Sequence, residues 1–270
     1  MRLLKRSPTG HVELTLFDDD DPPRYAILSH TWSDGNEVTY NELLAGNSNG
    51  KTGFAKITFC MDKAAEDNIE YSWVDTCCID KSTSDELATA VNSMFKWYKR
   101  AVKCYVYLSD VHVPDEVTDT EKYRITWEEA FRRSRWFTRG WTLQELLAPP
   151  VVEFFSREGK RLGSKMSLEQ EIHTITSIAI QALRGQSLFE LDIEERMRWA
   201  VERKTTRKED KAYCLWGLFG VFLPTLYGEG EEHAMLRLRE EIAKRQTHQD
   251  ALNLRITHGI ATVEKAESGS

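Results

Sequence analysis

Two kinds of apolar pattern alternate over the first 156 residues of the chain. Continuous apolar runs bounded by turn residues are typical of strands buried on both faces, whereas apolar residues at i, i+3 and i+4 mark one face of a helix. Strands are predicted at residues 25–28, 71–75, 102–108 and 151–155. Helices are predicted at 53–68, after a capping-box pair at Thr83 and Glu86, and after a second such pair at Thr126 and Glu129. The alternation predicts an α/β fold, a doubly wound and mostly parallel sheet of four or five strands, with 25–28 and 102–108 in its interior.

The pattern changes after residue 156, where helical stripes follow one another without strands. Residues 156–165 are predicted to form a turn or hairpin. Helices are then predicted along a stripe from Leu168 to Leu183, at 193–202, at 210–219 and from Met235 to Ile242. The expected organisation is a lead-in at 1–23, a domain at 24–246 with an α/β part (24–156) and a helical C-terminal portion (157–246), and a linker or tail at 247–270.

The charge and cysteine content argue against several classes of protein. With 36 Lys and Arg against 43 Asp and Glu, the net charge is −7, so the broad basic surface of a nucleic-acid-binding protein is absent. Residues 212–227 are uncharged, but the segment is short and contains Gly217 and Pro224, so we predict a core helix and a turn and no membrane span. Five cysteines, an odd number without a C-x-x-C pair, predict reduced thiols in the cytoplasm. No two histidines have zinc-type spacing, so neither a metal nor a resident cofactor is expected.

Polar and aromatic residues follow the predicted strands directly. Ser29, His30 and Trp32 close the first strand, Asp75 closes the second, and Asp110 follows the third. In a parallel, doubly wound sheet, ligands bind beyond the carboxyl ends of the strands. These residues are therefore expected to lie near one edge of the sheet and to contribute to a binding site.

Two other motifs suggest chemistry that the sequence does not support further. Cys77 with His30 and a carboxylate would form a cysteine-nucleophile site, but nothing in the spacing brings them together, and a single His is typical of a structural hydrogen bonder. The run Gly228-Glu229-Gly230-Glu231 resembles a phosphate-binding loop. Its two carboxylates would repel a phosphate at a helix N-terminus, so a phosphate loop is rejected.

The segment 134–150 combines two Trp, two Arg and one carboxylate within a short distance. Leucines at 143, 146 and 147 predict a short helix with one apolar stripe, which Pro149 and Pro150 end. Glu145 falls off this stripe and is expected to be accessible to solvent, where a Glu is usually no more than a solvated side chain. An aromatic-rich segment flanked by Arg is, however, typical of the wall of a binding pocket.

Three blocks of sequence together resemble the fungal heterokaryon incompatibility (HET) domain. They are YAILSHTW at 25–32, WVDTCCID at 73–80 and RGWTLQELL at 139–147, and a fourth block comprises DKAYCLWGLFG at 210–220 and YGEG at 227–230. The resemblance implies a cytoplasmic effector that triggers programmed cell death in fungal innate immunity and that self-associates on activation. It also implies a longer parent chain, because a nucleotide-binding oligomerisation module and repeats follow the domain in the best-known members.

The HET domain is in turn held to be distantly similar to TIR domains. Plant-type TIR domains carry a W-C-x-x-E-L segment on a helix, and its Glu is catalytic in those that cleave NAD. Here the segment runs from Trp141 to Leu146 with Thr142 in place of the Cys, so that the catalytic Glu corresponds to Glu145. The helices predicted after residue 156 depart from the TIR pattern.

This second resemblance implies an NAD glycohydrolase (NADase), a hydrolase that cleaves the nicotinamide–ribose bond through an oxocarbenium-like transition state. Glu145 would stabilise the cation, and Glu145→Gln would then remove turnover and leave stability unchanged. The implied substrate-binding residues are Ser29, His30, Trp32, Asp75, Arg139 and Trp141. Either Trp32 or Trp141 would stack on a ring, and either Arg135 or Arg139 would pair with pyrophosphate. The alternative is a non-enzymatic signalling module that recruits partners, in which Glu145 is an interfacial or structural ion-pair residue.

Overall fold

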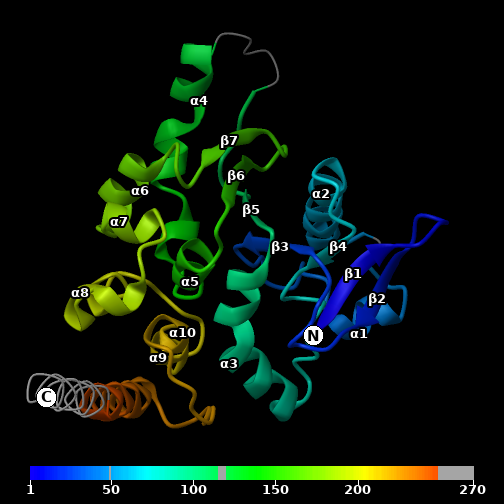
Figure 1. Cartoon of the computed structure of the whole chain (residues 1–270). Helices are drawn as coiled ribbons and strands as arrows, with labels where there is room; N and C mark the ends of the chain where they lie inside the picture. The colour runs from blue at the N-terminus through cyan, green and yellow to red at the C-terminus, as the bar shows by residue number, and fades with distance from the viewer. Residues whose placement is uncertain (49, 115–119, 249–270) are drawn as a thin grey trace, which may run out of the picture.

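A seven-stranded sheet forms the centre of the molecule (Figure 1). The computed structural model describes residues 1–48, 50–114 and 120–248, and the strand order is β2-β1-β4-β3-β5-β6-β7. The strands are β1 (Arg2–Arg6), β2 (Val12–Leu16), β3 (Tyr25–His30), β4 (Tyr71–Trp73), β5 (Lys103–Leu108), β6 (Val152–Ser156) and β7 (Arg161–Ser164). The four central strands are parallel, whereas β1, β2 and β7 pair antiparallel at the edges.

The predicted α/β class and mostly parallel sheet are confirmed, and so is the interior position of the first and third predicted strands. All six residues of β3 are buried, and β3 pairs with β4 on one side and β5 on the other. The prediction of four or five strands is wrong, because the segment expected to be a lead-in contains the β1–β2 hairpin and the hairpin after β6 adds β7. The chain leaves β3 for β4 on one side and returns to β5 on the other, which makes the β3–β5 edge the topological switch point.

Helices cover both faces of the sheet. Those of the α/β part are α1 (Tyr40–Leu44), α2 (Thr52–Glu66), α3 (Ser84–Arg100), α4 (Thr120–Arg132), a 3-10 turn η1 (Arg135–Thr138) and α5 (Thr142–Leu147). Phe59 of α2 packs against Tyr107 and Phe155 on one face. Trp97 of α3 packs against Trp73, whose ring lies 5.5 Å away on the other face.

The helix starts differ from the predicted ones. Thr83 begins α3 without a side-chain cap, since its hydroxyl donates to the Asp80 carbonyl at 3.4 Å. The Glu86 carboxylate accepts hydrogen bonds from the Asp80 amide and the Arg2 guanidinium. Thr126 lies inside α4, which begins at 120, so both predicted capping boxes are wrong. The capping box that does form joins Thr39 and Glu42 at the start of α1.

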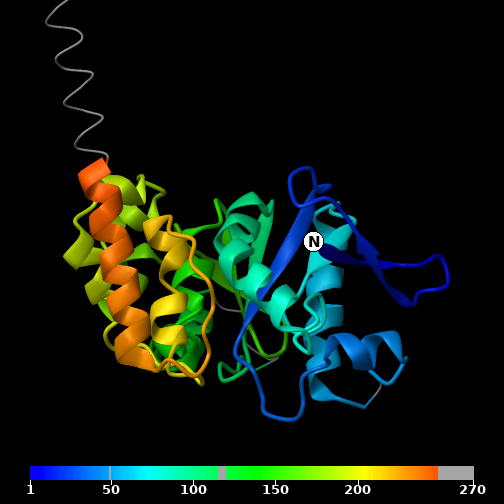
Figure 2. The ribbon, with the colours of Figure 1, turned by 90° about the horizontal axis from the view of Figure 1, so that it is seen from below.

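The C-terminal portion is helical, as predicted, but its helices before residue 231 are shorter than predicted and the last one is longer. They are α6 (Glu169–Thr176), α7 (Ile180–Leu183), a 3-10 turn η2 (Leu188–Glu190), α8 (Ile193–Arg198), α9 (Asp210–Tyr213), α10 (Trp216–Phe219) and a helix at 231–248. The single stripe predicted from Leu168 to Leu183 is broken because Ser177 takes a left-handed conformation with φ of 57°. Figure 2 shows these helices gathered on the side of the sheet away from the β1–β2 hairpin.

The linker or tail predicted at 247–270 falls mostly outside the described residues, which end at 248. The other predicted domain boundaries remain predictions. Within the described residues, no helix is both long and apolar enough to cross a membrane.

The loop before the helix at 231–248 binds a carboxylate from the chain itself. The amides of Gly228 and Gly230 both donate to one Glu209 oxygen at 3.0 Å, and both glycines have positive φ, 106° and 81°. Such backbone amides at a helix N-terminus form an anion site. The resemblance to a phosphate loop therefore had a physical basis, but here the anion is the Glu209 side chain.

We expect Glu209→Gln to loosen the helix at 231–248 and to lower stability by about 1 kcal/mol at pH 7, as for the loss of a helix cap. Hydrogen bonds from backbone amides, its own and those of the two glycines, lower the pKa of Glu209 below 4.5. Its contribution is thus present above pH 4.5 and is lost as the pH falls through the lowered pKa. Amide hydrogen exchange of residues 231–248 should be faster in the variant at pH 7. An exchange pattern identical to wild type would show that Glu209 does not hold the helix.

Candidate functional site

Five of the predicted site residues line one cavity at the carboxyl ends of β3 and β4. His30 ends β3, Trp32 follows it, Asp75 lies just beyond β4, and Arg139 and Trp141 come from the segment between η1 and α5. We call this cavity of about 190 Å³ the strand-end pocket. Its other lining residues are Ile79, Lys81, Leu87, Ala90, Val91, Met94, Thr206, Arg207, Asp210 and Tyr227.

One wall of the strand-end pocket is an aromatic ring held by two charged groups. The Trp32 indole donates to an Asp75 carboxylate oxygen at 3.0 Å. The Lys81 ammonium lies 3.7 Å from the centre of the Trp32 ring and 3.5 Å from the same carboxylate. Because 44% of Trp32 is exposed, its ring stands at the mouth of the pocket, where a planar ligand can reach it.

The opposite wall comes from the helical C-terminal portion. Asp210 accepts hydrogen bonds from the Trp141 indole at 3.1 Å and the Tyr227 hydroxyl at 3.0 Å. Burial raises the pKa of Asp210, while these two hydrogen bonds lower it. The Arg207 guanidinium lies over the Tyr227 ring at 4.1 Å. We did not assign these residues from the sequence, although 210–220 and 227–230 belong to the fourth block of the resemblance.

His30 lies between two carboxylates at the base of the pocket. Its Nε2 is 3.6 Å from Glu37 and 3.9 Å from Asp75, distances too long for hydrogen bonds, and neither ring nitrogen has a hydrogen-bond partner among the described residues. Burial would raise the pKa of Glu37, but interactions with His30 and the Lys56 ammonium lower it to about 2. Lys56 also donates to the Thr31 carbonyl at 3.0 Å, so this buried ion pair fixes the loop that carries Trp32.

Glu145 and Ser29 lie next to the pocket but do not line it. The Ser29 hydroxyl donates to the Glu145 carboxylate and accepts from the Trp136 indole at 2.7 Å. Burial raises the pKa of Glu145 to about 8, with Asp75 acting in the same direction. The predicted solvent accessibility of Glu145 is wrong, because every residue of α5 is buried and Glu145 itself is 8% exposed.

Two buried cations hold the helix that carries Glu145. Arg203 donates to the Arg139 carbonyl and the Thr142 hydroxyl, both at 2.9 Å, at the start of α5. Lys165 donates to the Leu146 and Pro149 carbonyls at 3.2 and 2.9 Å, where a cation interacts favourably with a helix C-terminus. Burial lowers the pKa of Arg203 to about 10 and that of Lys165 to about 8. The position of Glu145 is thus set from both ends of its helix.

Two other candidates from the sequence lie outside the pocket. The Cys77 thiol donates to the Val74 carbonyl, and its pKa is raised by hydrogen bonding to Cys78 and by burial, which disfavours a thiolate nucleophile. Asp110 accepts from the Ser134 hydroxyl and the Arg135 amide, both at 2.8 Å, and so fixes η1. In the described part of the chain, no group of three His, Cys, Asp or Glu residues is arranged to hold a metal ion.

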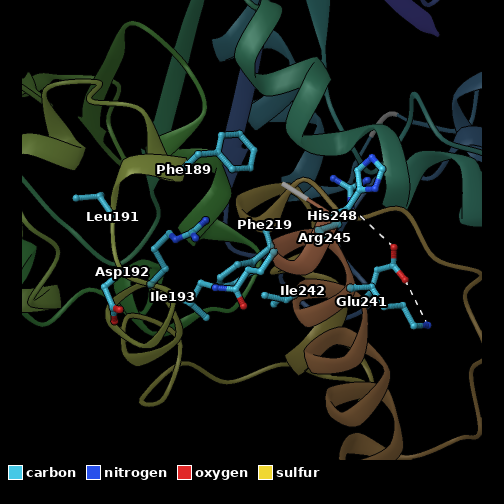
Figure 3. A pocket seen from close by; sticks show the side chains of 12 residues that line it. Phe189, Leu191, Asp192, Ile193, Phe219, Glu241, Ile242, Arg245 and His248 are labelled. Carbon is cyan, nitrogen blue, oxygen red and sulfur yellow. Dashed lines mark ion pairs between the residues drawn. The ribbon is translucent and has the colours of Figure 1, made fainter. Parts of the chain in front are cut away.

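The side chains that line the strand-end pocket suit a planar, charged ligand, but the pocket is small. It combines three aromatic rings, three cations and two carboxylates with an apolar floor from α3. Its volume of about 190 Å³ is below the roughly 300–1,000 Å³ of most small-molecule sites, so it has room for a single ring but not for a whole dinucleotide. A larger cavity of about 870 Å³ lies elsewhere, beside the helix at 231–248 (Figure 3).

Both matches of the chain to known proteins are to incompatibility proteins. Residues 25–122 match the family model described as "Heterokaryon incompatibility protein (HET)". Over its full length, the chain is 49% identical to the vegetative incompatibility protein HET-E-1 of Podospora anserina, in an alignment of 274 residues. The match covers 20% of that relative, so the chain spans about a fifth of its length. No solved structure matches the chain significantly.

Proposed function

Because the chain belongs to the heterokaryon incompatibility (HET) domain family, we propose that it is a cell-death effector domain of fungal non-self recognition that cleaves the nicotinamide–ribose bond of NAD. The observation that carries the proposal is the convergence of His30, Trp32, Asp75, Arg139 and Trp141 on one pocket, next to a buried Glu145 whose pKa burial raises to about 8. We also propose that the domain acts in the cytoplasm and self-associates on activation. In the longer parent protein, a nucleotide-binding oligomerisation domain and repeat domains would follow it.

The order of the parallel strands supports a distant likeness to TIR domains. Taken in chain order, the parallel strands are arranged second, first, third, fourth, as in flavodoxin-like doubly wound sheets. Nucleotides bind to such sheets at the carboxyl end of the switch point. His30 ends β3, one of the two strands at the switch point, and the strand-end pocket opens on the β4 side of it.

The charges of the pocket suit one end of NAD. Trp32 and Trp141 offer rings on which nicotinamide can stack, and Asp75 and Asp210 favour the positive pyridinium. The volume admits the nicotinamide ring with its ribose at the mouth. Lys81, Arg139 and Arg207 are then available for the pyrophosphate, for which guanidinium groups are well shaped.

Glu145 would act on the ribose as a carboxylate, with Ser29 holding it in place. In the free protein burial keeps the acid neutral near pH 7. The positive pyridinium ring of bound NAD favours the ionised form, so substrate binding itself would generate the charge that stabilises the oxocarbenium ion. Since Glu145 does not line the pocket, the proposal requires α5 or the Ser29 side chain to shift when the ring enters.

One observation favours the second candidate function, a non-enzymatic signalling module that recruits partners. Glu145 has a hydrogen-bond partner in Ser29 and is shielded from the pocket, which is the arrangement of a structural carboxylic acid. On this reading the strand-end pocket would bind a nucleotide without cleaving it.

We expect NAD loss to increase with pH, because the active form of Glu145 is the carboxylate. The pKa of about 8 in the free protein should appear as a rising limb in kcat/KM, and the limb in kcat should lie lower because the bound pyridinium lowers the pKa. Nicotinamide release by concentrated protein, brought together through a fused dimeriser, would be followed by chromatography from pH 5.5 to 9.

Two variants complete this measurement. Asp75→Asn removes a charge from the pocket and should weaken NAD binding. The control is His112→Gln, because His112 lies outside the pocket, where it pairs with Glu158. NAD that binds and is released intact at every pH would support the signalling module. Absence of both binding and cleavage would remove the strand-end pocket from the proposal.

A further inference from the structure

A second cavity, larger than the strand-end pocket, lies away from it in the helical C-terminal portion. We call it the C-terminal cavity. Its lining residues are Phe189, Leu191, Asp192, Ile193, Arg196, Phe219, Glu241, Ile242, Lys244, Arg245, Gln246 and His248 (Figure 3). Its volume of about 870 Å³ lies within the range of small-molecule sites, roughly 300–1,000 Å³. Nothing in the proposed NAD chemistry uses it.

A buried cation without an anion lies in the wall of this cavity. Arg196 is 4% exposed, and its Nη1 donates to the Leu218 carbonyl at 2.9 Å. Its Nε is buried without a partner, and no carboxylate of the described residues lies within 4.0 Å of the guanidinium. The guanidinium stacks on the Phe219 ring at 4.5 Å, which fixes its orientation. Burying a charge in this way is unfavourable unless a counter-charge arrives.

None of the cavity's carboxylates forms an ion pair with this guanidinium: burial lowers the pKa of Arg196, and the nearby Asp192 charge offsets this only in part. Asp192 is engaged as the N-cap of α8, where it accepts from the Glu195 amide at 3.0 Å. Glu241 faces two other cations, Lys244 at 3.8 Å and Arg245 at 3.9 Å, shown by dashed lines in Figure 3. Three cations therefore stand against two carboxylates, and the cavity favours an anion.

Apart from Gln246 and His248, the remaining lining is apolar and partly uncovered. Ile193, Phe219 and Ile242 are contributed by three different helices, and Phe189 stands at the rim with 71% of its surface exposed. An exposed Phe beside a roomy cavity gives an apolar ligand a surface that water otherwise covers. A ligand that fits both features carries an anionic head and an apolar body.

We propose that the C-terminal cavity binds an organic anion with an apolar body, whose carboxylate or phosphate head pairs with Arg196 while its body packs on Phe189, Ile193 and Ile242. Guanidinium groups pair with both kinds of head. The site is separate from the strand-end pocket, so a ligand here would regulate the domain or anchor it without taking part in cleavage.

The test uses isothermal calorimetry with four probes: dodecanoate, dodecyl phosphate, dodecanol and acetate. Dodecanoate or dodecyl phosphate should bind, and the stronger of the two identifies the head group. Acetate should not bind, because it lacks the body, and dodecanol should bind at least 10-fold more weakly than the better anion. Equal affinity for dodecanol and both anions, or tight binding of acetate, would overturn the proposal.

Arg196→Met keeps the length and apolar volume of the side chain and removes its charge. It should weaken binding of the anion roughly 10- to 100-fold, as expected for hydrogen bonds to a charged group, and leave dodecanol binding unchanged. Arg161→Met, an exposed arginine outside the cavity, is the control. Phe189→Ala provides a second test that does not disturb the interior, since this side chain is largely exposed, and it should weaken both the anion and dodecanol. Anion binding unaltered in both variants would place the ligand elsewhere.

Discussion

Glu145→Gln is expected to make the protein more stable at pH 8 while it abolishes most of the turnover. Burial raises the pKa of Glu145 from 4.5 to about 8, so the folded protein holds its proton more tightly than the unfolded chain does. A group of this kind contributes stability that is fully present below pH 4.5 and is lost as the pH rises through 8. At about 1.4 kcal/mol per pKa unit, the loss approaches roughly 4–5 kcal/mol above pH 8, and Gln does not suffer it.

The same substitution removes the charge that the proposal places beside the oxocarbenium ion. Turnover should fall by about 10²–10⁴, which corresponds to roughly 3–5 kcal/mol of barrier. A solvent-accessible Glu, as expected from the sequence, would have left stability unchanged. The burial found in the structure changes that expectation, because the acid that would be needed for catalysis destabilises the fold when it ionises.

The measurement is a melting temperature at pH 4.5, 6, 7 and 8 for both proteins, together with NAD loss. The difference in stability should be close to zero at pH 4.5 and should grow with pH. Glu129→Gln, an exposed Glu paired with Arg133, is the control and should show no such growth. A variant that is less stable than wild type at pH 8 would mean that Glu145 is ionised and paired in the folded protein, which is the structural role.

Gly217→Ala is expected to separate α10 from α3 and to cost about 3 kcal/mol, the upper part of the range for overpacking a core. A Cβ at this position would lie 2.1 Å from the Cβ and 2.5 Å from the Cγ of Phe95. Neither atom is the free end of a side chain, so one of the two helices must move. For a chain of this length the melting temperature should fall by about 6 °C. Because Met94 on α3 and Tyr227 after α10 both line the strand-end pocket, nucleotide binding should be lost as well.

A double-mutant cycle with Phe95 separates this cause from others. Phe95→Ala retains the atom that is closest to the new methyl group and should restore little of the stability. Phe95→Gly removes that atom. In the double variant it should show a favourable coupling energy with Gly217→Ala of more than about 1 kcal/mol, which is separate from the cost of placing Gly in a helix. Additive effects of Phe95→Gly and Gly217→Ala would show that the two helices do not meet at Gly217.

The parallel centre of the sheet was predictable because its strands are buried on both faces and so appear as unbroken apolar runs, such as 25–28. β1 has only Leu3 and Leu4 between charged residues, because it lies near the edge of the sheet, and this pattern does not distinguish a strand from a polar segment. Pairing of Leu4 with Ser72 is a long-range contact that local sequence does not encode.

The candidate site also contains some residues that were predictable from the sequence and others that were not. Residues at strand ends, such as His30 and Asp75, were predictable because parallel topology brings them to one edge. Asp210 and Tyr227 were not, because their position depends on how the C-terminal helices pack against α3. The burial of Glu145 was missed because the polar residues of α5 suggest a solvent-facing side, whereas the structure encloses the helix on all sides. The partner Ser29 is also distant in the sequence.

The two walls of the strand-end pocket are made at different times during synthesis of the chain. The last strand of the sheet ends at Ser164, whereas the second wall consists of Thr206, Arg207, Asp210 and Tyr227. A growing polypeptide can therefore complete its sheet on the ribosome while the pocket is still open on one side. A chain that ends before Tyr227 lacks part of this wall, so the pocket is complete only after translation has passed that residue.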